Sequence, residues 1–453
     1  MKHLLYLSFR LFYSIKHRIT KRFTAAGLLV LGGLGASAVV GIDTNQTMAY
    51  QIFTFLLSLL VISLTVSLFF RGRFTANRVL PRFGTAGENL SYYVVIQNLS
   101  RKTQPGLYFS EDFGDARPTF KEFLETPEPR EKTRNRFDRA VGYHRWLWLI
   151  SRKPGANVKE HSIDALPPNS EKEIPVNIIP SHRGRLSFNG LTISRPDPLG
   201  LYKSFIRIST RQSLMVLPKR YSLPPFSLPG TRRYQSGGVA LASSVGDSEE
   251  FVTLRDYRPG DPLRRIHWRS WAKTGKPIVT EHQDEFFVRH ALILDTFQEE
   301  TQSKRFEAAV SVAASFTCSI QTQESLLDLM FVGTEAYCFT SGRGLAHTDR
   351  MLEILASVSA ITDKPFSVFP PVVYERAGML SGSICILLSW DEDRKQFVGH
   401  LKSLGVPVLV LVITDSPAQP KAELDSDLGP MSDNPKNFHR IEAGKLQEGL
   451  ANL

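Results

Sequence analysis

Residues 255–281 read RDYRPGDPLRRIHWRSWAKTGKPIVTE, and they mark the boundary between two different sequence patterns. Short alternating strands precede this stretch, whereas apolar strands that alternate with helices follow it. The stretch itself places seven Lys and Arg side chains around one Pro-Gly-Asp turn and two tryptophans. Arg and Trp are frequent energetic anchors at protein interfaces. Because no nucleophile lies at motif spacing from a base, the stretch indicates recognition or assembly rather than catalysis.

This signature segment predicts a tight turn at Pro259-Gly260-Asp261, then a short helix from His267 and Trp268 through Ala272. Gly275 ends that helix before a strand at Pro277–Glu281. Two interpretations stay open: a clamp to the following domain through buried charge-assisted hydrogen bonds, or a docking surface for another protein. The candidate residues are Arg255, Tyr257, Pro259, Gly260, Asp261, Arg264, Ile266, His267, Trp268 and Lys276. We expect no nucleic-acid binding, because nearby acids dilute the basic field, and His267 lacks the partner that a catalytic base needs.

The pattern R-D-Y-x-P-G-D-x-x-R-x-I-H-W-x-x-x-A-x-x-G-K, followed by an apolar strand that ends in Asp, resembles bacterial membrane proteins of the family "domain of unknown function 58". Arg183-Gly184-Arg185 and the segment 197–201 (DPLGL) resemble the strand-turn-strand that precedes the family's signature. The resemblance implies a von Willebrand factor A-like domain after the signature. It also implies an association with MoxR-type AAA+ ATPases.

The net charge of +11 is concentrated near the N-terminus. Residues 1–82 hold ten Lys and Arg and one acid, which gives +9, and the remaining residues give +2. This distribution is typical of membrane topology and not of a domain that neutralises phosphates of nucleic acid.

The three cysteines, Cys318, Cys338 and Cys385, have no metal-ligand spacing, so we expect buried free thiols in a reducing compartment.

Two uncharged apolar segments follow the basic N-terminus, at residues 23–42 and 50–70. Each is long enough to cross a hydrocarbon core of about 30 Å at a rise of about 1.5 Å per residue. A signal peptide is the alternative for the first segment, but its length and the second segment favour a transmembrane hairpin. Basic residues flank the hairpin on both outer sides, so the positive-inside rule predicts cytoplasmic termini and cytoplasmic soluble domains. Residues 3–15 predict a short amphipathic helix on the inner leaflet.

The region 75–217 predicts an antiparallel, immunoglobulin-like β-sandwich. Its expected strands are Ser91–Gln97, Glu173–Ile179, Arg185–Ser194, Tyr202–Ile208 and Ser213–Leu217. Residues 121–137 are interpreted as a solvated charged loop, with a regulatory contact as the alternative. Trp146 and Trp148 are placed on one face of a strand, where they either pack in the core or form an exposed aromatic patch.

The region 288–453 alternates apolar strands with helices, which predicts a mostly parallel sheet covered on both faces. The expected elements are strands at Val288–Leu294, Ser325–Val332, Ala336–Thr340, Ser383–Ser389 and Val406–Ile413, and helices at Ser303–Ile320, Arg350–Ile361 and Arg394–Leu404. Domains that resemble it often bind a divalent metal through Asp-x-Ser-x-Ser. Here both hydroxyl positions are lost, to Phe297 and Glu299. We therefore expect no cofactor, and a residual Mg²⁺ site at Asp295, Thr296 and Asp391 is the alternative.

The predicted organisation is a basic N-terminus at 1–22, two transmembrane helices in 23–70, a β-sandwich at 75–217, a linker with the signature at 218–287, and a von Willebrand A-like α/β domain at 288–453. The predicted function is a non-enzymatic scaffold or adaptor in the bacterial inner membrane, working with an AAA+ ATPase. The oligomeric state stays open. One alternative is a metal-dependent binding protein or enzyme that uses Asp295 and Asp391. Another is an envelope-biogenesis component that acts through its membrane hairpin.

Overall fold

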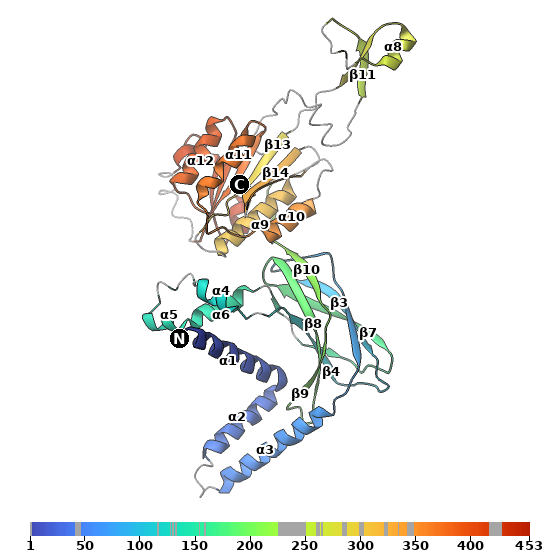
Figure 1. Ribbon diagram of the computed structural model, residues 1–453, viewed down its shortest axis with the longest axis vertical. Helices are drawn as coiled ribbons and strands as arrows, with labels where there is room; N and C mark the ends of the chain where they lie inside the picture. The colour runs from blue at the N-terminus through green and yellow to red at the C-terminus, as the bar shows by residue number, and fades with distance from the viewer. Residues whose placement is uncertain are drawn as a thin grey trace. The chain divides into compact units, whose positions relative to one another are not determined.

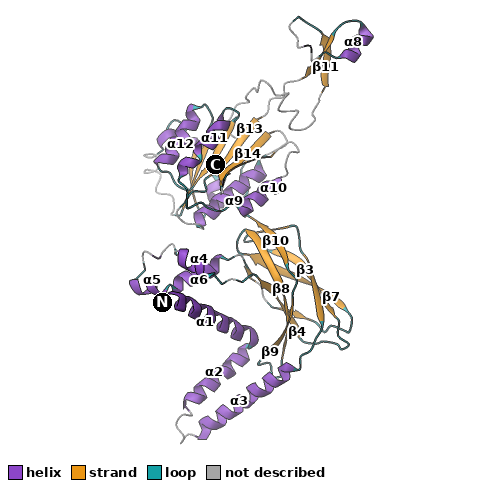
Figure 2. Cartoon of the chain, in the orientation of Figure 1, coloured by secondary structure: helices purple, strands orange, loops and turns teal. Residues whose placement is uncertain are grey.

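The computed structural model divides into two compact units, Met1–Lys219 and Arg220–Leu453. Figure 1 traces the chain and Figure 2 shows its helices and strands. The structure describes residues 2–40, 47–115, 117–126, 128, 131, 134–153, 155–157, 160–224, 251–259, 263, 266–282, 288–298, 303–320, 325–333, 335–341, 348–415 and 428–453.

Three helices open the first unit: α1 (Lys2–Arg22), α2 (Ala25–Val40) and α3 (Thr47–Leu68). The chain bends at Phe23 and Thr24, between α1 and α2 (Figure 1). Within α3, Met48–Leu68 is long and apolar enough to cross a membrane, whereas α2 has 16 residues and is shorter than that criterion requires. The structure therefore shows one helix of spanning length in the part of the chain that it describes.

The helix α1 is longer than the predicted segment 3–15, and it has two different apolar faces. Tyr6 is buried against Phe120, Phe123 and Trp146, and its hydroxyl donates to the carbonyl of Pro118 at 3.1 Å. A second row of apolar side chains is exposed, and its members are Leu4, Leu7, Leu11 and Ile15. One face of α1 is thus fixed to the protein, while the other remains available to an apolar surface.

The partner of α1 is a group of short helices, and it corrects two predictions. These helices are α4 (Phe120–Glu125), α5 (Arg136–Val141) and α6 (Tyr143–Arg152). Trp146 and Trp148 lie on α6 and not on a strand, because the apolar spacing of residues 143–150 fits a helix that packs on α1. The described part of the segment 121–137 is also not a plain solvated loop, since α4 begins it and Glu131 pairs with Arg145.

The rest of the first unit is a pair of β-sheets around one core. The first sheet has the order β1-β3-β7-β5, and the second has the order β2-β10-β8-β4-β6, with β9 paired to β8. The strands are β1 (Phe74–Val79), β2 (Phe83–Thr85), β3 (Leu90–Asn98), β4 (Leu107–Phe113), β5 (Ala156–Asn157), β6 (His161–Ile163), β7 (Glu171–Pro180), β8 (Gly184–Pro196), β9 (Lys203–Ile208) and β10 (Gln212–Leu217).

Alternation of buried and exposed residues forms this sandwich, as the sequence predicts. In β3 the residues from Leu90 to Asn98 alternate between buried and more exposed positions, and β7 follows the same pattern. The inward side chains of both sheets meet in one buried cluster, which includes Val94, Phe109 and Phe188. The five predicted strands are all present, with ends that shift by at most two residues.

The second unit contains a sheet with the order β15-β14-β13-β16-β17-β18, in which only the β14–β15 pair is antiparallel. Its strands are β13 (Val288–Leu294), β14 (Ser325–Val332), β15 (Ala336–Ser341), β16 (Gly382–Leu387), β17 (Val408–Thr414) and β18 (Phe438–Glu442). Its helices are α9 (Lys304–Ser319), α10 (Thr348–Ser357), α11 (Pro370–Ala377), α12 (Glu392–Ser403) and α14 (Leu446–Ala451), with 3-10 turns at Phe366–Val368, Gly429–Met431 and Pro435–Asn437.

The near-continuous apolar strands account for this parallel sheet. Every residue of β16 is buried, as expected for a strand that is covered on both faces. The helix α10 ends four residues before the predicted Ile361, which instead pairs with Phe297 in an isolated bridge.

The prediction of buried thiols holds only for Cys385, because Cys338 is half-buried and Cys318 is exposed. Burial raises the pKa of the Cys385 thiol to about 12.

Candidate functional site

The first candidate site lies at the carboxyl end of the parallel sheet, where open α/β sheets bind ligands. Asp295 directly follows β13, and its side chain is fully buried. Asp391 is the N-cap of α12, where its Oδ1 accepts from the amide of Arg394 at 3.1 Å. The two carboxylates that the sequence singles out are therefore close to one common residue, Arg394.

The guanidinium of Arg394 joins these two carboxylates. Its Nε donates to Asp295 Oδ2 at 2.6 Å, and its Nη1 donates to Asp391 Oδ2 at 2.5 Å. Its Nη2 donates to the carbonyl of Phe297 at 3.2 Å. Two backbone amides complete the environment of Asp295: Phe297 donates to Oδ1 and Leu388 donates to Oδ2, both at 3.0 Å. Arg394 is thus an internal cation at the end of the sheet.

This geometry does not fit a divalent cation between Asp295 and Asp391. Such an ion needs several converging oxygens, and here the guanidinium takes the oxygens that face one another. Thr296 is fully buried, and its hydroxyl donates to the carbonyl of Val332 at 2.7 Å. The described residues contain no group of three or more His, Cys, Asp or Glu side chains that could hold a metal ion. The sequence signal for Arg394 was its position three residues after Asp391 at a helix start.

The second candidate site is the signature segment, which forms a small antiparallel hairpin with one helix. Its strands are β11 (Phe251–Asp256) and β12 (Ile278–His282), and its helix is α8 (Trp268–Thr274). Ile266 pairs with Val279 in an isolated bridge, and both side chains are buried. The amide of Tyr257 donates to the carbonyl of Pro277 at 2.9 Å. The predicted helix, its stop at Gly275 and the following strand are confirmed, with small shifts of their ends.

His267 has a structural task in this hairpin. Its Nδ1 accepts a hydrogen bond from the amide of Ser270 at 3.2 Å, which caps the N-terminus of α8. Its own amide donates to the carbonyl of Ile278 at 2.8 Å and ties the cap to β12. His267 therefore positions α8, which carries the two tryptophans of the segment.

Trp268 and Trp271 form an aromatic pair on α8, in which Trp268 is exposed and Trp271 is half-buried. Their rings stack with centroids 5.2 Å apart and an interplanar angle of 20°. Trp268 is 63% exposed, and Pro259 and Lys276 of the same segment are also exposed. An indole that is this accessible beside basic side chains is typical of an interface anchor. The predicted residues Gly260, Asp261 and Arg264 lie outside the described residues, as does the side chain of Arg255.

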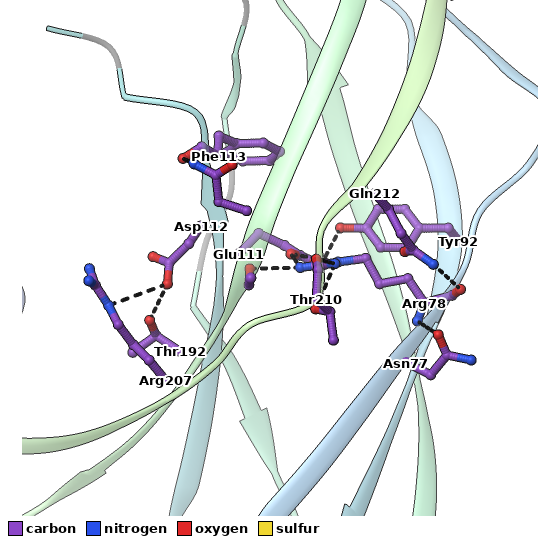
Figure 3. Close-up of polar contacts among 12 residues, drawn as sticks. Asn77, Arg78, Tyr92, Glu111, Asp112, Phe113, Thr192, Arg207, Thr210 and Gln212 are labelled. Carbon is purple, nitrogen blue, oxygen red and sulfur yellow. Dashed lines mark hydrogen bonds and ion pairs between the residues drawn. The ribbon is translucent and has the colours of Figure 1, made fainter.

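A third polar cluster lies inside the sandwich, where sequence reasoning did not find it (Figure 3). Arg78 Nε donates to both carboxylate oxygens of Glu111, at 3.0 and 2.9 Å, and Nη2 donates to Oε2 at 2.7 Å. Nη1 donates to the carbonyl and hydroxyl of Thr210, and Nη2 also donates to the carbonyl of Gly190. Tyr92 donates to Glu111 Oε1 at 2.7 Å. All of the guanidinium donors have acceptors.

This cluster connects the two sheets of the sandwich. Arg78 and Tyr92 come from the first sheet, whereas Glu111 and Gly190 come from the second. Burial and then the charge of Glu111 raise the pKa of Tyr92, so its hydroxyl stays a donor. The available sequence signal was the inward register of Arg78 in β1, which it shares with Phe74 and Ala76. The cluster is closed to solvent, since the side chains of Arg78 and Glu111 have no exposed surface, and it serves architecture.

Comparisons with known proteins agree with the resemblance at the signature. Residues 253–374 match the family described as "Protein of unknown function DUF58". A DUF58 domain occupies this part of the chain. The Uncharacterized protein YeaD of Bacillus subtilis (strain 168) is 26% identical over 187 residues, which cover 41% of this chain and 45% of that protein. The chain thus matches less than half of the length of that relative.

Some solved structures are similar to about a third of the chain. The CARDB domain of the PF1109 protein from Pyrococcus furiosus shares 12% identity over 30% of this chain and 87% of its own, with a TM-score of 0.16. A β-glucosidase from Listeria innocua shares 13% identity over 32% of this chain and 17% of its own, also with a TM-score of 0.16.

Proposed function

We propose that this protein is a non-enzymatic, membrane-anchored scaffold whose signature hairpin docks another protein. The observation that carries the proposal is the exposed indole of Trp268, which stacks on the half-buried Trp271. Burial of large aromatic side chains in a partner's pocket contributes strongly to binding. Between a clamp and a docking surface, the exposure of Trp268 favours docking.

The anchor in this proposal is the N-terminal hairpin of α2 and α3. The spanning length of α3, the apolar sequence of α2 and the basic flanks on both sides support two spans with the soluble units in the cytoplasm. The exposed row Leu4, Leu7, Leu11 and Ile15 supports a position of α1 on the surface of the inner leaflet. The bacterial inner membrane is the compartment that fits these features.

The parallel sheet gives the second unit a von Willebrand A-like organisation in this proposal, and the paired sheets give the first an immunoglobulin-like one. A metal-dependent enzyme or binding protein has less support, because Arg394 already pairs with both Asp295 and Asp391. Envelope biogenesis through the hairpin remains compatible with the anchor but has no observation of its own. By family resemblance, a MoxR-type AAA+ ATPase is the first partner to test.

The test is an in-cell crosslink followed by affinity purification of the full-length protein and mass spectrometry. Trp268→Ala removes the exposed indole but leaves the His267 cap and Gly275 in place. Leu404→Ala is the matched control, because Leu404 is an exposed apolar residue of the same unit outside the signature. We expect an AAA+ ATPase to co-purify with the wild type and the control and to be lost with Trp268→Ala. Retention of every partner by a folded Trp268→Ala variant would show that the hairpin is not the docking surface.

A further inference from the structure

A large cavity separates α1 from the sandwich inside the first unit. Its volume is about 1180 Å³, and it belongs to neither the signature hairpin nor the parallel sheet. One wall is the second half of α1, from Tyr13 to Arg22. The opposite wall comes from β4, β8, β9 and the turn after β4, and it includes Asp112, Thr192 and Arg207.

Two sets of contacts hold this cavity open. Near the middle of α1, Arg117 Nη1 donates to Ser14 Oγ at 2.9 Å. At the end of α1, the amide of Thr24 donates to the carbonyl of Leu201 at 3.1 Å, and Phe23 pairs with Tyr202 in an antiparallel bridge. Because α1 is tied down near its middle and at its C-terminal end, the space beneath its second half is part of the fold.

The second tie also fixes where the apolar helices begin. Thr24 caps α2, since its hydroxyl accepts from the amide of Gly27 at 3.1 Å. A Cβ on Gly27 would lie 2.0 Å from the carbonyl oxygen of Leu201, so only glycine permits this close approach. Near the end of α3, the carbonyl of Ser67 accepts from Ser204 Oγ at 2.7 Å. The cavity therefore lies next to the ends of both apolar helices.

The turn that contacts the start of α2 is the Asp-Pro-Leu-Gly-Leu segment, residues 197–201, which the sequence singled out. The carboxylate of Asp197 accepts from the amides of Leu199, Leu201 and Tyr202, at 3.0, 2.7 and 2.7 Å. Gly200 has a φ of +67°, which favours glycine. These bonds hold the carbonyls of Gly200 and Leu201 close to Thr24. The hydroxyl of Thr24 donates to the carbonyl of Gly200.

The cavity has an excess of positive charge. Its lining residues include the basic residues Arg18, Lys21, Arg22, Arg117 and Arg207 and the acidic residues Glu111, Asp112 and Asp115, of which the side chain of Glu111 has no exposed surface. The charge of Glu111 is already balanced by Arg78, which is not part of the lining. Asp115 is engaged by Arg117, and Asp112 by Lys21 at 2.9 Å.

The remaining cations of the lining are accessible. The side chain of Arg207 is 78% exposed and lies 3.8 Å from Asp112, which is a long contact. Arg18 and Arg22 are exposed on α1, and Arg22 lies near the rings of Tyr202 and Phe205. Desolvation and the charges of Lys21, Arg117 and Arg207 lower the pKa of His17, while Asp112 opposes this effect. A group in this cavity thus experiences a positive local potential.

We propose that this cavity binds a phosphate-bearing anion, supplied by the headgroup of an anionic phospholipid. Guanidinium groups bind phosphate oxygens with paired, charge-assisted hydrogen bonds, and Arg18 and Arg207 face the space from opposite walls. Neutral donors lie beside them, among them the side chains of Tyr13, Asn189 and Ser209. Headgroups of anionic lipids occur at the depth where apolar helices emerge from a bilayer.

The experiment measures lipid retention by the full-length protein in detergent, using native mass spectrometry during titration with phosphatidylglycerol or phosphatidylcholine. The variant Arg18→Gln/Arg207→Gln removes two of the three accessible cations but none of the ties that hold α1. The matched control Lys2→Gln/Arg10→Gln also removes two positive charges. Both come from α1, at positions that do not line the cavity. Hydrogen exchange of β3 and β7 checks that all variants remain folded.

We expect the wild type to retain phosphatidylglycerol over phosphatidylcholine and the cavity variant to bind it at least about tenfold more weakly, with the control unchanged. Equal losses in the variant and the control would show general charge attraction and overturn the proposal. Equal retention by all three proteins would overturn it as well. A separate titration with inorganic phosphate follows the exchange protection of residues 13–22. Inorganic phosphate could protect these residues in a way that depends on Arg18 and Arg207, while the protein shows no selectivity between the two lipids. That result would show that the cavity binds phosphate but that a lipid headgroup does not supply it.

Discussion

The two units each bury an arginine–carboxylate pair, but the pairs lie in different kinds of places. Arg78 and Glu111 join two sheets in the middle of the sandwich, and neither side chain has exposed surface. Arg394 and Asp295 lie at the carboxyl end of the parallel sheet, and the third member, Asp391, has 47% of its side chain exposed. The first pair is enclosed by the core, whereas the second sits where such folds bind ligands.

This difference teaches how similar chemistry serves two purposes. A fully enclosed pair can only fix the arrangement of the elements that carry it, and its removal leaves an uncompensated charge with no access to water. At the sheet end, Arg394 occupies the carboxylate oxygens that a bound cation would need. We therefore expect removal of Arg78 to damage the fold, and removal of Arg394 to change what the sheet end can bind.

The largest effect is expected for Arg78→Met, which leaves the carboxylate of Glu111 buried and without its cation. We expect a loss of about 3–5 kcal/mol in the stability of the sandwich. Native-state hydrogen exchange of β1 and β4 measures it, because these strands carry the pair. The double variant Arg78→Met/Glu111→Leu should recover part of the loss. A single variant as stable as the wild type would show that the pair does not hold the sheets.

Arg394→Met should cost less, about 1.5–3 kcal/mol. Asp295 keeps the amides of Phe297 and Leu388 as donors, and the nearby Asp391 is open to water. Hydrogen exchange of β13 and β16 reports this change, while β1 and β4 serve as the internal control. The comparison between the two pairs fails if Arg394→Met destabilises its unit more than Arg78→Met destabilises the sandwich.

A smaller and more specific effect is expected when Arg394 becomes Ala. The substitution releases Asp295 Oδ2, Asp391 Oδ2 and the carbonyl of Phe297, which now share one cation. Converging oxygens are the ligands that Mg²⁺ and Ca²⁺ prefer. We expect either ion, at about tenfold its dissociation constant, to stabilise this variant by about 1.4 kcal/mol in thermal unfolding, and to leave the wild type unchanged.

Arg394→Lys is the control for this ion effect, because an ammonium group still occupies the position between the carboxylates. Equal stabilisation of Arg394→Lys or of the wild type by Mg²⁺ would show that the ion acts elsewhere on the protein. A failure of Arg394→Ala to respond would show that the oxygens do not converge once the guanidinium has gone.

The sequence predicted regular elements better than it predicted these pairs. Alternation identified β3 and β7, and apolar runs identified β13 and β14, because burial of a strand face constrains every second residue or all of them. The helix α6 was missed, since the Trp-x-Trp spacing places both indoles on one face of a strand. The contact of Trp146 with Tyr6 on α1 favours a helix over a strand for this segment, and no local pattern reveals that contact.

The polar sites depend even more on distant contacts. Asp295 and Asp391 were recognisable from their positions after apolar strands, but their shared partner came from the first turn of α12. Glu111 lies 33 residues from Arg78, and nothing in the spacing joins them. In the signature segment, by contrast, the helix and its end at Gly275 follow from local rules, because the αL glycine is a local stop signal.

The smallest expected effect is a difference in pH dependence between the units. Tyr92 has a raised pKa in the folded sandwich, so its contribution is complete below the ordinary pKa of about 10 and is lost as the pH rises beyond it. Burial raises the pKa of Asp391, but hydrogen bonds from Ser389 and Arg394 and the charge of Arg394 lower it overall. Its contribution is complete above about pH 4 and is lost as the pH falls further.

Hydrogen exchange at several pH values separates these contributions, once the intrinsic exchange rates are taken into account. Tyr92→Phe should flatten the alkaline loss of stability in β1 and β4, and it should cost about 1 kcal/mol at neutral pH for the lost hydroxyl. Asp391→Asn should flatten the acid loss in β13 and β16 with little effect at neutral pH, because Asn also caps helices well. If Tyr92→Phe leaves the alkaline profile of the sandwich unchanged, another group controls it. The enclosed pair and the pair at the sheet end would then no longer differ in the direction of their response to pH.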